Sequence, residues 1–221
     1  DQVEMRGLAI MSEDPGLIRA FHSPDDFFVT LARTVFQDPT IIKADPRRQT
    51  IKNTGYAEIY GAGVAKLAQT AGIPQEQAAA TKAAFRHAYS QVPEFLQETF
   101  TNAMLAAAQE GTLAYTTCPL TGRRHYADRG KEYVLVNYKI QGWAAALFKR
   151  KLLQAAAAGL GQFMILPVHD EIILEVPDED VRDVVHLIRK VMSDSISFPV
   201  PISAGIATGK TWGDKVEWED D

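Results

Sequence analysis

Between residues 12 and 159 the chain is divided into helix-length segments by residues that start and stop helices. Ser12-Glu13-Asp14-Pro15 and Ser23-Pro24-Asp25-Asp26 each place capping side chains before a predicted helix. These two helices are expected to run to Phe21 and Phe36. Glycines follow several of the later helical segments, where a positive φ is needed. The further helices are predicted over residues 47–60, 64–70, 74–91, 93–110 and 137–158. This punctuation favours a mainly helical fold.

The strand-like segments are short and lie mostly near the C-terminus. Two apolar, β-branched runs, residues 163–168 and 172–176, are separated by His169, Asp170 and Glu171, which predicts a hairpin of two buried strands. A helix over 177–195 follows. Strand character is also expected at residues 3–9, within 112–126 and at 202–207, and the acidic tail 217–221 is expected to be solvated. A helical majority with a small antiparallel sheet is an α+β fold.

Composition excludes several classes of protein. The 221 residues suffice for one large domain or two small ones, and the net charge of −5 argues against a wholly basic nucleic-acid-binding module. The single cysteine, Cys118, cannot form an internal disulfide and fits a reducing compartment such as the cytoplasm. Apolar stretches are too short for a membrane span, so no membrane partner is expected. Residues 149–151 are three successive cations that suit either a DNA backbone or solvent.

Arg48, Lys52, Tyr56 and Tyr60 are spaced four residues apart on one predicted helix. Four residues turn a helix through roughly 400°, so the four side chains form one slowly winding stripe. We call these residues the 48–60 stripe. Two cations and two rings suit a ligand with both charge and a flat face, such as a nucleoside triphosphate. The same spacing suits an amphipathic surface helix with solvated cations and half-buried rings. Gly55, inside this helix, indicates close packing or a hinge.

The bend at His169-Asp170-Glu171 places two carboxylates between two strands. Carboxylate oxygens are the ligands that Mg²⁺ prefers, and nucleotidyl transfer uses carboxylates to fix two such ions. A polar turn without a metal would have the same composition, so the bend alone leaves both interpretations open.

Taken together, these segments resemble motifs of the family A DNA polymerases, the group of bacterial polymerase I and its phage relatives. Residues 1–9 are similar to the second part of motif A. Residues 48–61 are similar to motif B, the fingers helix that closes over the incoming nucleotide, and residues 168–175 to motif C of the palm. The resemblance covers essentially the whole chain, and Tyr56 is typical of the phage-type variant.

The resemblance implies catalytic roles for three residues. Asp170 is expected to be a catalytic metal ligand, with Glu171 beside it as a secondary ligand. Lys52 is expected to act as a general acid toward the leaving pyrophosphate. The implied cofactor is Mg²⁺, with two ions in the intact enzyme.

The resemblance also implies how the substrates are held. Arg48 and Lys52 match the residues that grip the triphosphate of a dNTP. Tyr56 matches the residue that stacks near the nucleotide sugar, and Glu4 matches the acidic gate that crowds a ribose 2′-hydroxyl. Other matching residues are expected to contact primer or template: Tyr60, Asn137, Gln141, His169, Arg123 and Arg124.

Three departures from the family pattern stand out. The metal-binding Asp of motif A would lie two residues before Asp1 and is not in the sequence, and Asp1 is not its substitute. Phe28 stands where many members have a triphosphate-binding His. Residues 55–57, Gly-Tyr-Ala, replace the more usual Asn-aromatic-Gly pattern. We therefore expect this stretch to be inactive alone and to need the N-terminal remainder of a longer polymerase.

The predicted organisation is palm for residues 1–11, fingers for 12–136 with motif B at 47–60, and palm again for 137–221 with motif C at 163–176. The stripe and the bend are expected to face one shared cleft that holds a Mg²⁺-bound dNTP beside primer–template DNA. Two alternatives remain open: a single-subunit RNA polymerase, or a non-catalytic DNA-binding module with a polymerase fold. Glu4 and Glu171 favour the DNA polymerase.

Overall fold

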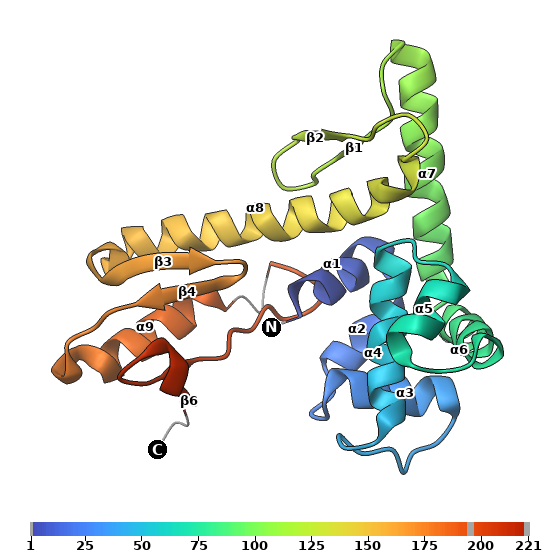
Figure 1. The fold of residues 1–221 in the computed structure, drawn as a ribbon. Coiled ribbons are helices and arrows are strands. Elements are labelled where there is room, and N and C mark those ends of the chain that lie inside the picture. The colour runs from blue at the N-terminus through green and yellow to red at the C-terminus, as the bar shows by residue number, and fades with distance from the viewer. Residues whose placement is uncertain (1, 194–196, 219–221) are drawn as a thin grey trace. The chain divides into compact units, whose positions relative to one another are not determined.

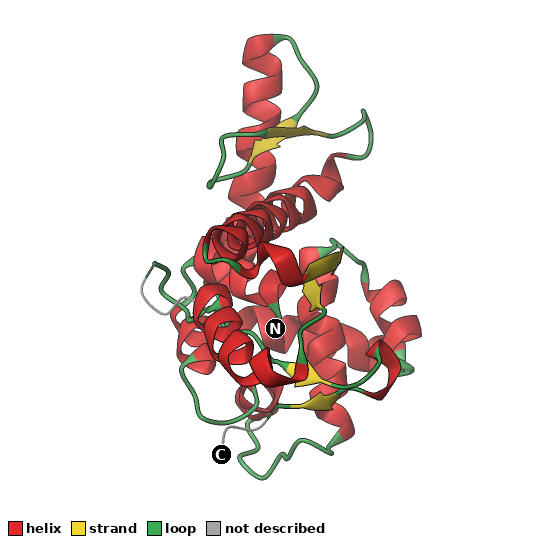
Figure 2. Cartoon of the chain, turned by 90° about the vertical axis from the view of Figure 1, so that its left-hand side faces the viewer, coloured by secondary structure: helices red, strands yellow, loops and turns green. Residues whose placement is uncertain are grey.

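The structure is a computed structural model that describes residues 2–193 and 197–218 (Figure 1). Helices account for most of this part of the chain, as Figure 2 shows. None of the helices described is long and apolar enough to cross a membrane. The α-helices are α1 (Val3–Ser12), α2 (Pro15–Phe21), α3 (Phe27–Phe36), α4 (Pro46–Ile59), α5 (Val64–Ala71), α6 (Gln75–Ala88), α7 (Gln91–Glu110), α8 (Leu135–Ala157) and α9 (Val181–Met192).

The described strands form three separate two-stranded antiparallel sheets. They confirm the α+β class, with three small hairpin-like pairs in place of one small sheet. The pairs are β1 (Tyr115–Thr117) with β2 (Arg124–Tyr126), β3 (Met164–Val168) with β4 (Glu171–Leu174), and β5 (Ala207–Thr208) with β6 (Val216–Glu217).

The chain divides into two compact units. One comprises residues 4–144, and the other comprises residues 145–221 together with residues 1–3. We call them the helical unit and the C-terminal unit. The predicted boundaries between fingers and palm, at residues 11 and 136, stay predictions.

The helical unit is built on apolar contacts between consecutive helices. Ala57, Leu67 and Ala78 join α4, α5 and α6 in one buried cluster. A second cluster, which includes Ala103 and Leu135, joins α7, the β1–β2 hairpin and the start of α8. Elements that follow one another along the chain therefore pack against each other through their apolar faces.

Residues 3–9, predicted as a strand, form helix α1 instead. The buried residues Met5, Leu8 and Ser12 recur at helical spacing. Gly7 allows α1 to lie close against α8, since a Cβ at this position would lie 3.1 Å from Cε3 of Trp143. The prediction was wrong because the segment holds one β-branched residue, Val3, and its apolar period is that of a helix.

Asp14 joins the starts of two helices. Its Oδ1 accepts hydrogen bonds from the backbone N–H groups of Gly16 and Leu17, which confirms the predicted cap of α2. Its Oδ2 accepts from the backbone N–H of Gln91, the first residue of α7. The helix predicted from Pro93 therefore begins two residues earlier, at a position held by a distant carboxylate.

We expect Asp14→Ala to lower the free energy of unfolding by about 2 kcal/mol, because each lost cap costs about 1 kcal/mol. Urea unfolding followed by circular dichroism measures the change. Ser90→Ala is the matched control, since Ser90 precedes α7 but makes no side-chain cap hydrogen bond. Equal stability of the two variants would contradict the double-cap interpretation.

The β3–β4 hairpin forms as predicted, but its strands are not buried. Ile165 and Leu166 are 57% and 47% exposed. One face of the hairpin packs on a cluster that includes Leu160 and Ile188, while an irregularity in the pairing between Met164 and Leu166 turns consecutive apolar residues outward. The apolar composition predicted the two strands correctly, but it did not show whether one or both faces of the hairpin are buried.

The remaining C-terminal segments differ in part from expectation. The strand predicted over 202–207 is reduced to an isolated bridge at Ile202 and to Ala207–Thr208, which pairs with Val216–Glu217. Glu217 thus belongs to a strand and not to a free tail. The expected positions of Asp1, of the α9 end at Ser195 and of residues 219–221 lie outside the described residues.

Lys151 is not part of a DNA-facing run of cations. It is 6% exposed, and its Nζ donates hydrogen bonds to the backbone oxygens of Val191 and Ser193, at 2.9 and 3.1 Å. These carbonyls lie at the end of α9, where cations favour the helix dipole. Lys149 and Arg150 are exposed, so the run divides between a structural cation and two surface cations.

Candidate functional site

Helix α4 carries Arg48, Lys52 and Tyr56 of the stripe, and Tyr60 follows as its C-terminal cap residue. The helix begins at Pro46, one residue before its predicted start, and Asp45 caps it by accepting a hydrogen bond from the backbone N–H of Arg47. Gly55 is closely packed, since a Cβ there would lie 3.0 Å from Cε of Met5. The close-packing interpretation of this glycine is confirmed.

Arg48 is held by a carboxylate from α3. Its Nε and Nη2 donate to Oδ1 and Oδ2 of Asp26, at 2.8 and 2.7 Å. The two side chains are 19% and 20% exposed, so the pair is largely shielded from solvent. The hydrogen bond from Arg48 is the main reason that the pKa of Asp26 lies below its ordinary value. Arg48 is therefore not a fully solvated cation, and it is not an unpaired arginine either, because Asp26 already binds one edge of its guanidinium group.

The side chains of Arg48 and Lys52 both lie over one aromatic ring. The ring of Phe28 is 1% exposed, and its centroid lies 5.7 Å from Cζ of Arg48 and 5.8 Å from Nζ of Lys52. The same ring lies 6.3 Å from the ring of Tyr56. Phe28 therefore provides an apolar surface over which two cations are held.

Three predicted site residues from distant parts of the sequence meet in one hydrogen-bonded group. The Tyr60 hydroxyl donates to the Glu4 carboxylate, at 3.1 Å to Oε2. The Gln141 amide donates to Oε1 of Glu4 at 3.1 Å and to the Tyr60 oxygen at 3.3 Å. Partial burial and then the charge of Glu4 raise the pKa of Tyr60, which keeps its hydroxyl protonated as a donor. We call Glu4, Tyr60 and Gln141 the gate group.

The rings of Tyr56 and Tyr60 link the gate group to the stripe. Their centroids lie 6.5 Å apart with the planes inclined by 27°. The gate group and the two cations thus lie along one continuous row of side chains in the helical unit. Such a row offers cations, aromatic faces and a carboxylate to one elongated ligand.

Asn137 lies in the first turns of α8, and its Oδ1 is buried with no hydrogen-bond partner among the residues that the structure describes. Buried polar atoms nearly always have partners in folded proteins, so this amide is a candidate ligand contact.

The two predicted arginines lie at the β1–β2 hairpin. Arg124 pairs with Glu110 at 2.7 Å, and its Cζ lies 4.3 Å from the ring centroid of Tyr115. Arg123 is exposed immediately before β2. Arg123 therefore presents its charge to solvent, whereas that of Arg124 is balanced by a carboxylate.

The predicted acidic bend lies in the C-terminal unit. Val168 pairs with Glu171, so His169 and Asp170 form a two-residue loop between β3 and β4. His169 has a φ of +53°, which is uncommon for a residue other than glycine. Both loop residues are exposed. The loop projects the Asp170 carboxylate from a paired hairpin, as the sequence indicates.

Glu171 is the first residue of β4, and its Oε2 lies 3.4 Å from Nζ of Lys215. Within the described residues, no three His, Cys, Asp or Glu side chains form a group that could hold a metal ion. Mg²⁺ commonly takes only one or two protein carboxylates and completes its shell with water and substrate phosphates. The donor set at the bend suits an ion shared with a substrate, and not a metal enclosed by protein.

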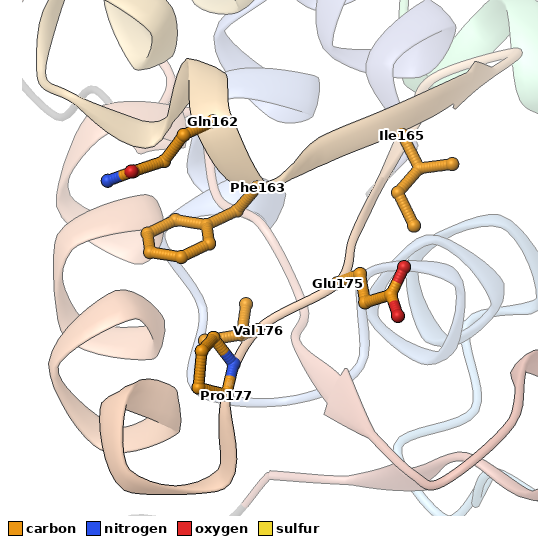
Figure 3. A pocket seen from close by; sticks show the side chains of 6 residues that line it. All are labelled: Gln162, Phe163, Ile165, Glu175, Val176 and Pro177. Carbon is orange, nitrogen blue, oxygen red and sulfur yellow. The ribbon is translucent and has the colours of Figure 1, made fainter.

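A pocket beside the same hairpin contains no predicted site residue. Its lining comes from the short 3₁₀ helix Leu160–Phe163, from β3 and from the chain after β4 (Figure 3), and comprises Gln162, Phe163, Ile165, Glu175, Val176 and Pro177.

Sequence reasoning missed Asp26 as a partner of the stripe. Asp26 was expected only to start a helix, and it does cap α3 by accepting from the backbone N–H of Val29. Its contact with Arg48 joins residues 22 positions apart, and no local pattern reveals such a contact.

The family model, the relatives and the solved structure that match this chain are all described as DNA polymerases or as part of one. The model of the family described as DNA polymerase family A matches residues 1–214. The DNA polymerase of Mycobacterium phage D29 is 31% identical over 95% of this chain and 33% of the phage protein. The thermostable DNA polymerase I of Thermus filiformis is 28% identical over 96% of this chain and 26% of that protein.

Among solved structures, the POL domain of Pol1 from M. smegmatis, in complex with DNA primer-template and dNTP, matches with a TM-score of 0.77 and 28% identity. The match covers 92% of this chain and 37% of that one. The chain therefore spans about a third or less of the length of the curated relatives cited above.

Proposed function

Because the chain belongs to DNA polymerase family A, we propose that it is the fingers and part of the palm of a DNA-templated DNA polymerase. The observation that carries this proposal is the gate group, in which Glu4, Tyr60 and Gln141 meet although they are separated by up to 137 positions. A solvated surface helix gives no reason for three predicted site residues to converge. We place this polymerase in the cytoplasm of a bacterial or phage-infected cell.

We infer that the row of side chains in the helical unit receives the dNTP. Arg48 and Lys52 would bind the triphosphate, Tyr56 would contact the sugar, and Glu4 would crowd a ribose 2′-hydroxyl. Glu4 suits the gate role because two hydrogen bonds fix its carboxylate and prevent it from moving aside. Lys52 would deliver a proton to the leaving pyrophosphate.

Primer and template would contact a second set of residues. Tyr60 would occupy the position of the template base between steps, and the orphan amide oxygen of Asn137 would find its partner on the nucleic acid. The remaining candidates are Gln141, His169, Arg123 and Arg124.

Asp170, with Glu171 beside it, would hold Mg²⁺ together with a motif A carboxylate from the N-terminal remainder. A Mg²⁺ ion bound at Asp170 would supply a lower pKa to the primer hydroxyl and positive charge to the phosphates. The expected cleft that the stripe and the bend share stays a prediction.

Primer extension by the full-length polymerase tests the function and the gate together. The wild-type protein should add dNTPs that complement the template, and Glu4→Ala should raise ribonucleotide use relative to dNTP use by about tenfold, the effect of relieving one close steric contact. Glu13→Ala, an exposed glutamate after α1, is the control and should leave the ratio unchanged. A wild-type protein that extends no primer would contradict the function, and an unchanged ratio in Glu4→Ala would contradict only the gate.

A further inference from the structure

The Asp26–Arg48 pair has a geometry that leaves part of the arginine available. A guanidinium has five N–H donors, and Asp26 takes one from Nε and one from Nη2. Among the residues that the structure describes, Asp26 is the hydrogen-bond partner of Arg48, which leaves both hydrogens of Nη1 and one of Nη2. The free edge can therefore bind an anion while the other edge stays on Asp26.

Asp26 is itself fixed in place. Its Oδ1 also accepts the backbone N–H of Val29 at 3.0 Å, so the carboxylate belongs to the first turn of α3 and cannot follow a moving arginine. Phe28, the second residue of the same helix, supplies the ring that lies near both Arg48 and Lys52. Helix α3 thus determines the position of Arg48 through one carboxylate and one ring.

We propose that Asp26 is a positioning residue that orients Arg48 for the triphosphate of the incoming nucleotide. This inference rests on the proposed function and adds to it a residue outside the 48–60 stripe. An arginine that is already ordered loses less side-chain freedom on binding a phosphate than one that is free. Asp26 acts through Arg48 and does not touch the substrate.

A competing effect has the opposite sign. Asp26 cancels one of the two positive charges of Arg48 and Lys52, so its neutralisation would by electrostatics alone strengthen the binding of an anion. Salt screens that effect, whereas the ordering of a side chain by packing and hydrogen bonds is much less dependent on salt. Measurements at low and at high salt therefore separate the two.

The decisive variant is Asp26→Asn in the full-length polymerase. Asparagine caps helices as well as aspartate, so α3 should form, but the bidentate charged pair is lost. We expect the KM for dNTP to rise about fivefold, which corresponds to the ordering of one long side chain, with kcat little changed. The rise should persist at high salt.

Two further variants test whether the rise in KM acts through Arg48. Asp45→Asn is the matched control, because Asp45 also caps a helix and pairs with an arginine, Arg47, outside the stripe. Its KM should equal that of the wild type. In an Arg48→Ala background, Asp26→Asn should have no additional effect, because Asp26 then has no arginine to position.

Direct binding of inorganic tripolyphosphate with Mg²⁺, measured by calorimetry, should weaken in Asp26→Asn as dNTP binding does. An unchanged or lower KM in Asp26→Asn, or the same loss in the Arg48→Ala background, would overturn the inference. These results differ from a failure of the proposed function, in which the wild-type protein itself would extend no primer. Asp26→Ser, which retains a capping hydroxyl, replaces Asp26→Asn if that variant does not fold.

Discussion

Replacing Asp170 by alanine in the full-length polymerase is expected to lower kcat by about 10³-fold or more, with a much smaller effect on DNA binding. A metal ion supplies several kcal/mol of stabilisation to the charge that develops at the reacting phosphate, and about 4 kcal/mol corresponds to three orders of magnitude in rate. The exposed two-residue loop gives Asp170 little structural role, so the loss should be confined to catalysis. Single-turnover primer extension measures it.

Asp178→Ala is the control for this experiment. Asp178 belongs to the same unit, its side chain is 81% exposed, and it pairs with Lys210 at 2.7 Å. Its removal changes the charge by the same amount without touching the bend, so kcat should not change. Comparable losses in the two variants would show a general effect of charge, and full activity in Asp170→Ala would remove the bend from the catalytic site.

The second large effect concerns stability. Glu58, near the end of α4, has a fully buried side chain that pairs with Arg86 at 2.9 Å and with Lys82 at 3.2 Å, both on α6. Glu58→Ala leaves the mostly buried ammonium of Lys82 without its carboxylate. Breaking a buried pair in this way costs about 3–5 kcal/mol, which is a large part of the stability of an ordinary domain. We expect Glu58→Ala to unfold the helical unit at a much lower urea concentration.

Fluorescence of Trp143 reports on this unit, because the residue is 1% exposed within it, and replacing Trp212 and Trp218 by phenylalanine removes the other two tryptophans. Glu110→Ala is the control, since Glu110 pairs with Arg124 at an exposed site and its loss should change the midpoint little. Glu58→Gln keeps the size of the side chain but removes its charge, so its unfolding midpoint distinguishes the loss of the ion pair from the loss of side-chain volume. A midpoint for Glu58→Ala equal to that of Glu110→Ala would contradict the role given to the buried pair.

Local signals predicted most of the helices well. Asp14 and Asp26 each cap the helix that follows, as their sequence positions indicate. The β3–β4 hairpin and its bend were also predictable, because a change from helical to strand-like composition and a short polar interruption are both readable in the sequence.

Errors arose where a segment depends on its neighbours. Residues 3–9 are an exception, because their helical period is readable in the sequence and only the close contact of Gly7 with Trp143 is not. Lys151 was placed among surface cations, yet it contacts the end of α9. The exposed Ile165 shows that apolar composition does not tell how many faces of a strand are covered.

The sequence by itself determined most of the helical segments, the spacing of the 48–60 stripe and the family to which the chain belongs, since each follows from residues that are near one another or from motifs in a fixed order. Only the tertiary structure decided which side chains meet. It joined Asp26 to Arg48 and brought Glu4, Tyr60 and Gln141 together, because such contacts depend on how helices pack, and packing is set by complementary shape over the whole helical unit.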